Sequence, residues 1–346
     1  SNGILGHNNQ TQYSSPTQIP GTNWSDIGGV KSDGTAWSWG PNESGELGIN
    51  SRTYQSSPIQ IPGTTWKVIY GSVGAAGQDS KRLAVKTDGT LWAWGWNSKG
   101  QLGQNNRTTY SSPVQIGSDT TWPTALRTGA IGWSGTYGSF HAIKTDGSLW
   151  AWGGNGYGNL GLNSETYYSS PVQVPGTTWK SLSGYGQGCM LATKTDGTLW
   201  AWGYNDSGQL GQNDRNMRSS PTQIPGTTWN IVNSSGARSL ATKTDGTLWA
   251  WGQNNYGQLG QGSQVKYSSP VQIPGTTWSR PTQSASGSGG AIKTDGTIWT
   301  WGAGASGILG QNSQSDTDSP VQVPGTLWID MRGSASQTRG QQLLEE

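Results

Sequence analysis

The sequence predicts an all-β protein: a seven-bladed β-propeller of four-stranded repeats about 50 residues long, forming a single domain over residues 1–346. Three observations predict this fold. A block of the type Lys-Thr-Asp-Gly-Thr-Leu-Trp-Ala-Trp-Gly occurs six times, and a block of the type Ser-Ser-Pro-x-Gln-x-Pro-Gly-x-x-Trp occurs seven times. The apolar residues show no helical periodicity anywhere. Dividing 346 residues by this period gives almost seven units.

The first block is typical of a β-hairpin. Asp-Gly accepts the positive backbone angles of a tight turn, and apolar residues alternate on both sides of it. Trp200 and Trp202 stand two residues apart, so on a strand they face the same side. Each copy therefore predicts two strands of one blade. The turn residue recurs at spacings of 55, 58, 50, 49 and 50 residues, at Asp33, Asp88, Asp146, Asp196, Asp245 and Asp295.

The second block predicts the outer strand of each blade, because its prolines cannot donate along a whole strand and belong at a sheet edge. Its closing Trp begins the next apolar run, as at Trp229. The chain starts and ends inside a repeat. We therefore expect about residues 1–24 to join about residues 325–346 and complete the last blade, which would cover two sheet edges. Residues 338–344 are a degenerate copy of the hairpin.

Tryptophan is the predicted core residue. Only 31% of the residues are hydrophobic, but 21 are Trp, and each Trp buries a large surface. Nineteen of them stand at repeat positions, where packing between blades explains them. Trp96 and Trp133 stand outside these positions, which makes them candidates for another role.

The combination of Asp-Gly-x-Leu-Trp-x-Trp-Gly, Asn-x-x-Gly-x-Leu-Gly and Pro-x-x-Val/Ile resembles the regulator of chromosome condensation repeat family. The resemblance covers essentially the whole chain, and the near identity of the copies is similar to bacterial or bacteriophage members. It implies a seven-bladed propeller whose last blade is shared between the two ends of the chain. The family includes a nucleotide-exchange factor and an inhibitor of β-lactamase, but no residue here can be matched to either role.

Several function classes are not supported by the composition. A net charge of +2 does not favour nucleic acid as a partner, and no apolar run is long enough for membrane insertion. The lone Cys189 and the two histidines, His7 and His141, form no metal or nucleophile pattern, so we expect no metal, no cofactor and no enzyme. The turn aspartates are expected to make local hydrogen bonds, and the lysine two residues before each to be a solvated charge at a strand end.

Two long segments break the repeat, over residues 71–82 and 126–140. Glycine-rich and aromatic loops on a rigid scaffold are frequent binding sites, although structural filler explains them as well. Tyr and Arg also recur before each Ser-Ser-Pro, and half-exposed Tyr and Arg are typical of interfaces. The candidate partner-binding residues are Trp96, Arg107, Tyr110, Trp133, Tyr137 and Phe140.

The expected function is therefore that of a non-enzymatic binding scaffold for protein–protein interaction, whose partner is another protein or a surface glycan. The alternative is a lectin-like propeller that binds glycans through its aromatic loops. Low charge, a surface rich in Ser, Thr, Asn, Gln and Gly, and the lack of disulfides favour an extracellular, cell-surface or virion component that assembles into a larger complex.

Overall fold

The structure is a computed structural model of the 346-residue chain. It describes residues 7–8, 18–19, 29–70, 80–124, 131–134, 138–184, 188–283, 287–326, 328–333 and 338–342.

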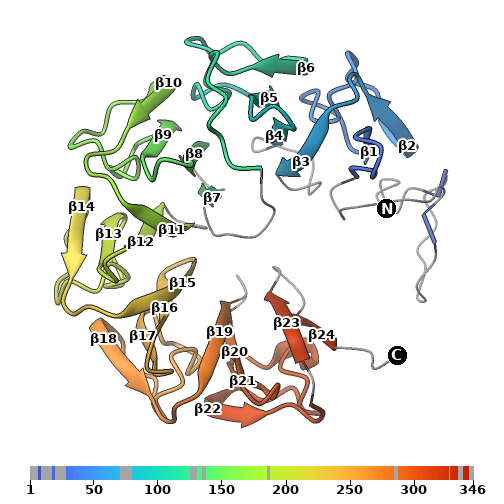
Figure 1. Ribbon diagram of the computed structural model, residues 1–346. Coiled ribbons are helices and arrows are strands. Elements are labelled where there is room, and N and C mark those ends of the chain that lie inside the picture. The colour runs from blue at the N-terminus through green and yellow to red at the C-terminus, as the bar shows by residue number, and fades with distance from the viewer. Residues whose placement is uncertain are drawn as a thin grey trace. The chain divides into compact units, whose positions relative to one another are not determined.

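The described chain is built of antiparallel sheets in which consecutive strands pair, without crossovers (Figure 1). Five of these sheets have four strands, and the first and last have two. The first sheet is β1 (Ala36–Gly40) and β2 (Gln55–Ile61). The second is β3 (Trp66–Tyr70), β4 (Lys81–Lys86), β5 (Leu91–Gly95) and β6 (Tyr110–Gln115). The third is β7 (Ile131–Ser134), β8 (Ser139–Ile143), β9 (Leu149–Gly153) and β10 (Tyr168–Gln173).

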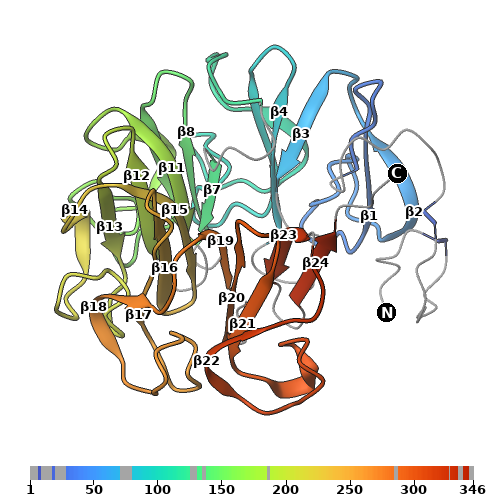
Figure 2. The same ribbon diagram turned by 60° about the horizontal axis from the view of Figure 1, so that its bottom comes forward.

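The fourth, fifth and sixth sheets repeat the four-stranded plan of the second and third (Figure 2). The fourth sheet is β11 (Trp179–Gly184), β12 (Cys189–Lys194), β13 (Leu199–Gly203) and β14 (Arg218–Ile224). The fifth is β15 (Trp229–Ser235), β16 (Arg238–Lys243), β17 (Leu248–Gly252) and β18 (Tyr267–Ile273). The sixth is β19 (Trp278–Gln283), β20 (Ser288–Lys293), β21 (Ile298–Gly302) and β22 (Thr317–Gln322), with a short 3-10 turn at Ala305–Gly307. The seventh is β23 (Trp328–Gly333) and β24 (Thr338–Gln342).

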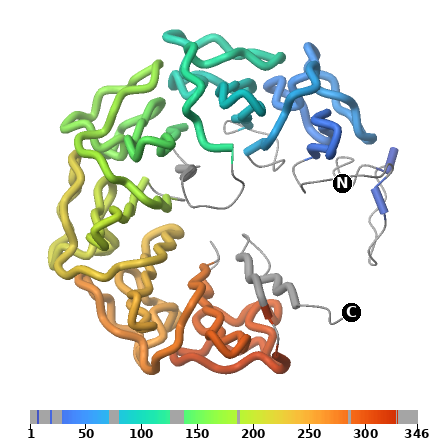
Figure 3. The backbone as a smooth tube through the Cα atoms, in the orientation of Figure 1, coloured from blue at the N-terminus to red at the C-terminus, as the bar shows by residue number. Residues whose placement is uncertain are grey.

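The chain divides into two compact units. The first unit comprises residues 1–131, 137–155 and 166–174, and the second comprises residues 132–136, 156–165 and 175–346. Within the second unit, β15 lies against β11 and β12, β19 lies against β15 and β16, and β23 lies against β19 and β20. From the fourth sheet to the seventh, the first strand of each sheet therefore packs beside the first strand of the next, and Figure 3 traces the chain through the fourth, fifth and sixth sheets.

The predicted closure of the last blade falls mostly on residues outside the described ranges. What the structure describes there is the pairing of β23 with β24, from Trp328 opposite Gln342 to Gly333 opposite Thr338. The degenerate hairpin copy that begins at Thr338 is therefore a strand.

The Asp-Gly turns form as predicted, and their chemistry explains why the block is so constant. Asp196 Oδ1 accepts hydrogen bonds from the backbone N–H of Thr198 at 2.9 Å and from its hydroxyl at 2.7 Å. The Thr198 hydroxyl in turn accepts the indole N–H of Trp200 at 2.9 Å. Gly197 has φ +78°, and a Cβ on it would lie 3.0 Å from the backbone nitrogen of Thr228. The Asp196–Gly197 turn is therefore hydrogen-bonded to strand β13 and packs closely against the segment at Thr228.

In five of the six Trp-x-Trp pairs the second Trp joins neighbouring sheets. Trp251 is fully buried, and its indole N–H donates to the carbonyl oxygen of Gln209, on the preceding blade's loop, at 2.8 Å. Gly211 in that loop allows the contact, because a Cβ there would lie 2.9 Å from the Trp251 indole nitrogen. The same bond recurs, with donor and acceptor at 2.9–3.0 Å, for Trp94–Glu46, Trp152–Gln101, Trp202–Asn159 and Trp301–Gln258. The predicted tryptophan core is confirmed at these positions.

Candidate functional site

Each four-stranded sheet has two ends with different connections. In the fourth sheet the Asp-Gly turn joins β12 to β13 at the end where β11 begins. The long segment 204–217 joins β13 to β14 at the opposite end, where β11 also turns back into β12. We call these the turn end and the loop end of a blade.

At the turn end the lysine that precedes each turn lies over aromatic rings. The Lys194 ammonium is 4.7 Å from the Trp179 ring centroid and 4.4 Å from that of Trp200. The two indoles themselves meet edge to face, with centroids 6.2 Å apart. The expectation of a solvated lysine is therefore wrong, because the aromatic faces attract the cation. The arrangement recurs for Lys86 with Trp66 and Trp92, Lys144 with Trp122 and Trp150, Lys243 with Trp229 and Trp249, and Lys293 with Trp278 and Trp299.

One blade adds an acid to this cluster. Asp119 forms a salt bridge with Lys144 and also accepts hydrogen bonds from the backbone N–H and the hydroxyl of Thr121. The hydrogen bond from Lys144, followed by that from the Thr121 hydroxyl, lowers the pKa of Asp119 to about 2. The carboxylate is therefore ionised at neutral pH, and its role is to hold the lysine.

At the loop end, Trp96 takes a regular place in the repeat. It directly follows β5, is half-buried, and donates its backbone N–H to Ser80 O at 2.9 Å. Tyr204 follows β13 in the same way, and its backbone N–H donates a hydrogen bond to the carbonyl oxygen of Gly188 at 3.2 Å. Trp96 therefore stands outside the Trp positions of the repeat, as predicted, at a loop-end position whose backbone recurs and whose residue type varies.

The other predicted site residues lie in different environments, as far as the structure describes them. Arg107 is exposed on the segment between β5 and β6, and Tyr110, half-buried, begins β6 and accepts a hydrogen bond from the Asn106 side-chain amide at 3.0 Å. Phe140 has 1% exposure and packs on Trp152, with ring centroids 5.8 Å apart, so it belongs to the core and we leave it out of the candidate site. Trp133 lies in β7, where the backbone alone is described, and Tyr137 lies outside the described residues.

The structure also exposes three large side chains at the loop end: Tyr54 belongs to the predicted periodic Tyr set before Ser-Ser-Pro, whereas Tyr167 and Met217 were not predicted. Tyr54 is 43% exposed, Tyr167 39% and Met217 42%. All three stand at one repeat position, immediately before the residue that pairs with the glycine ending the Trp-x-Trp strand. In the sequence this position lies two residues before Ser-Ser-Pro, so it directly precedes Tyr168 and Arg218, whereas in the first sheet the Tyr itself stands there.

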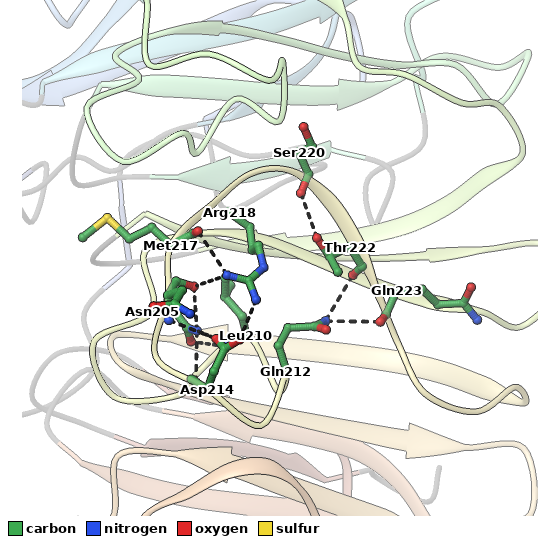
Figure 4. Close-up of polar contacts among 10 residues, drawn as sticks. Asn205, Leu210, Gln212, Asp214, Met217, Arg218, Ser220, Thr222 and Gln223 are labelled. Atoms are coloured by element: carbon green, nitrogen blue, oxygen red, sulfur yellow. Dashed lines mark hydrogen bonds and ion pairs between the residues drawn. The ribbon is translucent and has the colours of Figure 1, made fainter.

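The loops that carry these residues are held by internal hydrogen bonds, as Figure 4 shows for residues 205–218. The buried Asn205 side chain accepts the N–H of Leu210 at 2.9 Å and donates to the carbonyl of Asn216 at 2.9 Å. Arg218 pairs with Asp214, with Nη2 and Oδ2 2.5 Å apart. The exposed Met217 is therefore presented on a backbone that is fixed on both sides (Figure 4).

Each loop is also bound to the next blade. Asn163 has φ +53° and donates its backbone N–H to the carbonyl of Ser219 on the following outer strand at 2.8 Å. Tyr157, in the same loop, packs on Tyr204 of the following blade with ring centroids 4.9 Å apart. The Tyr204 hydroxyl donates to Asp206 Oδ2 at 2.5 Å. The aromatic residues of the loop end are thus set in a rigid frame.

The titratable groups of the described chain are mostly engaged in structure. Burial raises the pKa of the Cys189 thiol to about 12, so the thiolate is scarce at neutral pH. Burial lowers the pKa of Arg82 and of Arg238 to about 10, which leaves both charged. Within the described ranges, no group of three or more His, Cys, Asp or Glu is placed to hold a metal ion. No helix in that part of the chain has the length and apolar character needed to cross a membrane.

Comparison with known proteins identifies the family. The model of the RCC1-like domain matches residues 30–339. The chain belongs to the RCC1-like domain family. The predicted fold class, an all-β propeller of four-stranded antiparallel sheets, is confirmed by this match and by the solved structures.

Two solved structures illustrate the fold similarity. Human WBSCR16 superposes with a TM-score of 0.70 at 20% identity, covering 89% of this chain and 82% of that one. Yeast RCC1 (Prp20), solved bound to Kap60, superposes with a TM-score of 0.68 at 18% identity, covering 91% of this chain and 78% of that one.

The sequence relatives match over shorter stretches. Protein RCC2 of Mus musculus is 36% identical over 93 residues, which is 27% of this chain and 17% of RCC2. Ultraviolet-B receptor UVR8 of Arabidopsis thaliana is 31% identical over 93 residues, 27% of this chain and 20% of UVR8. Protein RCC2 of Homo sapiens is 30% identical over 146 residues, 42% of this chain and 26% of RCC2. The matched stretches therefore span 17–26% of the length of these relatives.

Proposed function

We propose that this RCC1-like propeller is a non-catalytic scaffold that binds another protein through the loop ends of its blades. The observation that carries the proposal is the set of exposed apolar side chains on loops with fixed backbones, of which Met217 is the best defined. Apolar and aromatic side chains supply most of the energy at the centre of protein interfaces. Loops that are ordered before binding lose little conformational entropy when a partner docks.

The contrast with the turn end supports the loop end as the binding surface. At the turn end the same Lys and Trp residues recur in each four-stranded blade described, and each lysine lies over indole rings of its own blade. At the loop end the equivalent positions hold Tyr167, Met217 and Lys266. Variation of exposed residues on a constant framework is what a specific binding surface needs.

Solved structures of similar fold support a protein as the class of partner. One structure describes yeast RCC1 bound to Kap60, and another describes the binding of Prp20p from Saccharomyces cerevisiae to Gsp1p and histones. Those partners belong to those proteins. For this chain we propose only the class of partner, a protein, and a place in an extracellular, cell-surface or virion assembly, which the low charge and polar surface favour.

Glycan binding is the less favoured function at the repeated tryptophans. A sugar would stack on the partly exposed face of the first Trp of each pair, such as Trp200. The Lys194 ammonium already lies 4.4 Å from the centroid of that ring. A glycan would have to displace a cation from its aromatic partners, which costs about 0.5–1 kcal/mol at exposed sites.

Affinity purification of the tagged chain from its native source, with mass spectrometry, tests the proposal. The loop-end variant is Tyr54→Ser, Tyr167→Ser and Met217→Ser combined, and the control is Lys67→Ser with Lys180→Ser, two exposed residues on the first strands of their blades. We expect the control to retain a specific protein partner that the loop-end variant loses. Equal recovery by both variants would contradict binding at the loop end, and binding of the wild type to glycans alone would contradict the partner class.

A further inference from the structure

The outer strand β22 departs from the repeat in its charge. Asp316 and Asp318 flank its first residue, Thr317. The residue equivalent to Asp318 is serine in each of the five preceding outer strands, at Ser56, Ser111, Ser169, Ser219 and Ser268. The residue equivalent to Asp316 is Tyr54, Thr109, Tyr167, Met217 or Lys266. In the described blades, β22 thus introduces two carboxylates at positions where the repeat has none.

These two carboxylates line an open cleft of about 350 Å³ with two exposed apolar side chains. Tyr256 comes from the loop end of the preceding blade and is 48% exposed, and Val321 of β22 is 40% exposed. Gln264, also from the preceding blade, completes the opposite wall. The cleft therefore combines an aromatic face, an aliphatic side chain and two acids.

The backbone fixes the two walls against each other. Gly262 donates its N–H to the carbonyl of Asp318 at 2.8 Å. Gly257 has φ +72°, and a Cβ there would lie 2.4 Å from the Asp318 Cα, so the loop that carries Tyr256 packs directly on β22. Tyr256 is held further by its backbone N–H, which donates to Gln258 Oε1 at 2.7 Å. The cleft is present before any partner binds.

Both acids have acceptor capacity left. Asp316 Oδ1 accepts the N–H of Gly304 at 2.9 Å, and Asp318 Oδ1 accepts the Ser319 hydroxyl at 3.4 Å. Among the described lysines and arginines, none forms an ion pair with either carboxylate. Lys266, two residues after Gln264 in the sequence, is exposed and does not line the cleft.

We propose that this cleft docks a positively charged, extended segment of a partner protein, with an arginine or lysine over Tyr256 and beside Asp316 and Asp318. A cation placed on an aromatic face and against carboxylates gains from both interactions. An adjacent aliphatic side chain of the partner packs on Val321. The proposal rests on the proposed function in taking a protein as partner, but it assigns the partner's charge and uses residues outside the loop-end variant above.

Fluorescence anisotropy of the full chain with a labelled peptide, Gly-Arg-Val-Arg-Gly, tests this directly. The comparison peptides replace both arginines with citrulline, which keeps the shape and removes the charge, or with glutamate. We expect binding of the arginine peptide alone, weakened as NaCl rises from 50 to 500 mM, as expected for ion pairs at a surface.

The variant Asp316→Asn with Asp318→Ser removes the charge. Asn keeps an acceptor for Gly304, and Ser is the residue of the other blades, so thermal unfolding should be unchanged. We expect this variant to bind the arginine peptide at least tenfold more weakly than the wild type does. Tyr256→Ala should lose affinity to a similar extent. The control Asp196→Asn with Asp245→Asn removes the same net charge from exposed residues at the turn end, keeps a side-chain acceptor for Thr198 and Thr247, and should bind as the wild type does.

Three results would overturn the inference: equal binding of the citrulline peptide, unchanged binding by the Asp316/Asp318 variant, or an equal loss in the control. The native-partner experiment remains separate from this one. If the peptide does not bind but the loop-end variant still loses its partner, the proposal for the cleft is contradicted. The proposed function is not affected by that result.

Discussion

The turn ends and the loop ends of the blades differ in how closely they repeat. At the turn end, the Lys243 ammonium lies 4.7 Å from the Trp229 ring centroid and 4.4 Å from that of Trp249. Lys194 lies at the same two distances from the ring centroids of Trp179 and Trp200. At the loop end the same framework carries Tyr167 in one blade and Met217 in another. Comparison of the repeats therefore distinguishes two groups of residues. Residues that are constant among the blades maintain the blade structure, and residues that vary give each blade a different surface. Predictions on stability should follow that division.

Removing a buried tryptophan should have the largest effect. Trp251→Ala takes away a fully buried indole and its hydrogen bond to Gln209, and should lower the free energy of unfolding by about 3–5 kcal/mol. Chemical denaturation followed by Trp fluorescence measures this. A loss below about 1 kcal/mol would mean that this contact between blades contributes little to stability.

Removing one turn-end lysine should have an intermediate effect. Lys243→Met keeps an apolar side chain of similar length but loses the cation over Trp229 and Trp249, so we expect a loss of about 1 kcal/mol. Lys67→Met is the matched control, because Lys67 is exposed and lies over no described ring. If both variants unfold alike, the lysine over the rings is not stabilising.

The acid in the Lys144 cluster should make a smaller, pH-dependent contribution. Its folded pKa of about 2 lies below the ordinary value of 3.8, so its stabilisation is present above pH 4 and is lost as the pH falls toward 2. Because the Asp119 side chain is 36% exposed, we expect less than about 1 kcal/mol. Asp119→Asn should flatten this part of a stability–pH curve, and an unchanged curve would contradict the assignment.

Loop-end substitutions should affect stability least. Met217→Ser replaces a side chain that is 42% exposed, so the free energy of unfolding should change by less than about 0.5 kcal/mol. Arg218→Ser, next to it, breaks the ion pair with Asp214 and should loosen the loop without unfolding the blade. Hydrogen exchange over residues 205–218 distinguishes the two. Faster exchange in Met217→Ser would show that Met217 helps to hold the loop.

Most of the fold was predictable because its signals are local. The Asp-Gly turn and the Trp spacing depend on residues two to six apart, and the structure has the hairpins where those residues predict them. The site was less predictable because burial depends on contacts between distant segments. Phe140, expected on a loop, is covered by Trp152, and Lys194, expected in solvent, is placed on Trp179 by the pairing of β11 with β12.

The repeat period, the strand pattern and the identity of the core residues are thus properties of the sequence, since each follows from short-range turn chemistry and alternation. Which residues share a surface is a property of the tertiary structure. The loop of one blade packs on the outer strand of the next, so Tyr256 and Asp318, about sixty residues apart in the sequence, line the same cleft. The repeat period does not predict that these two residues line one cleft, because packing between blades brings them together. Both proposed binding surfaces are formed by loops that this packing holds in place.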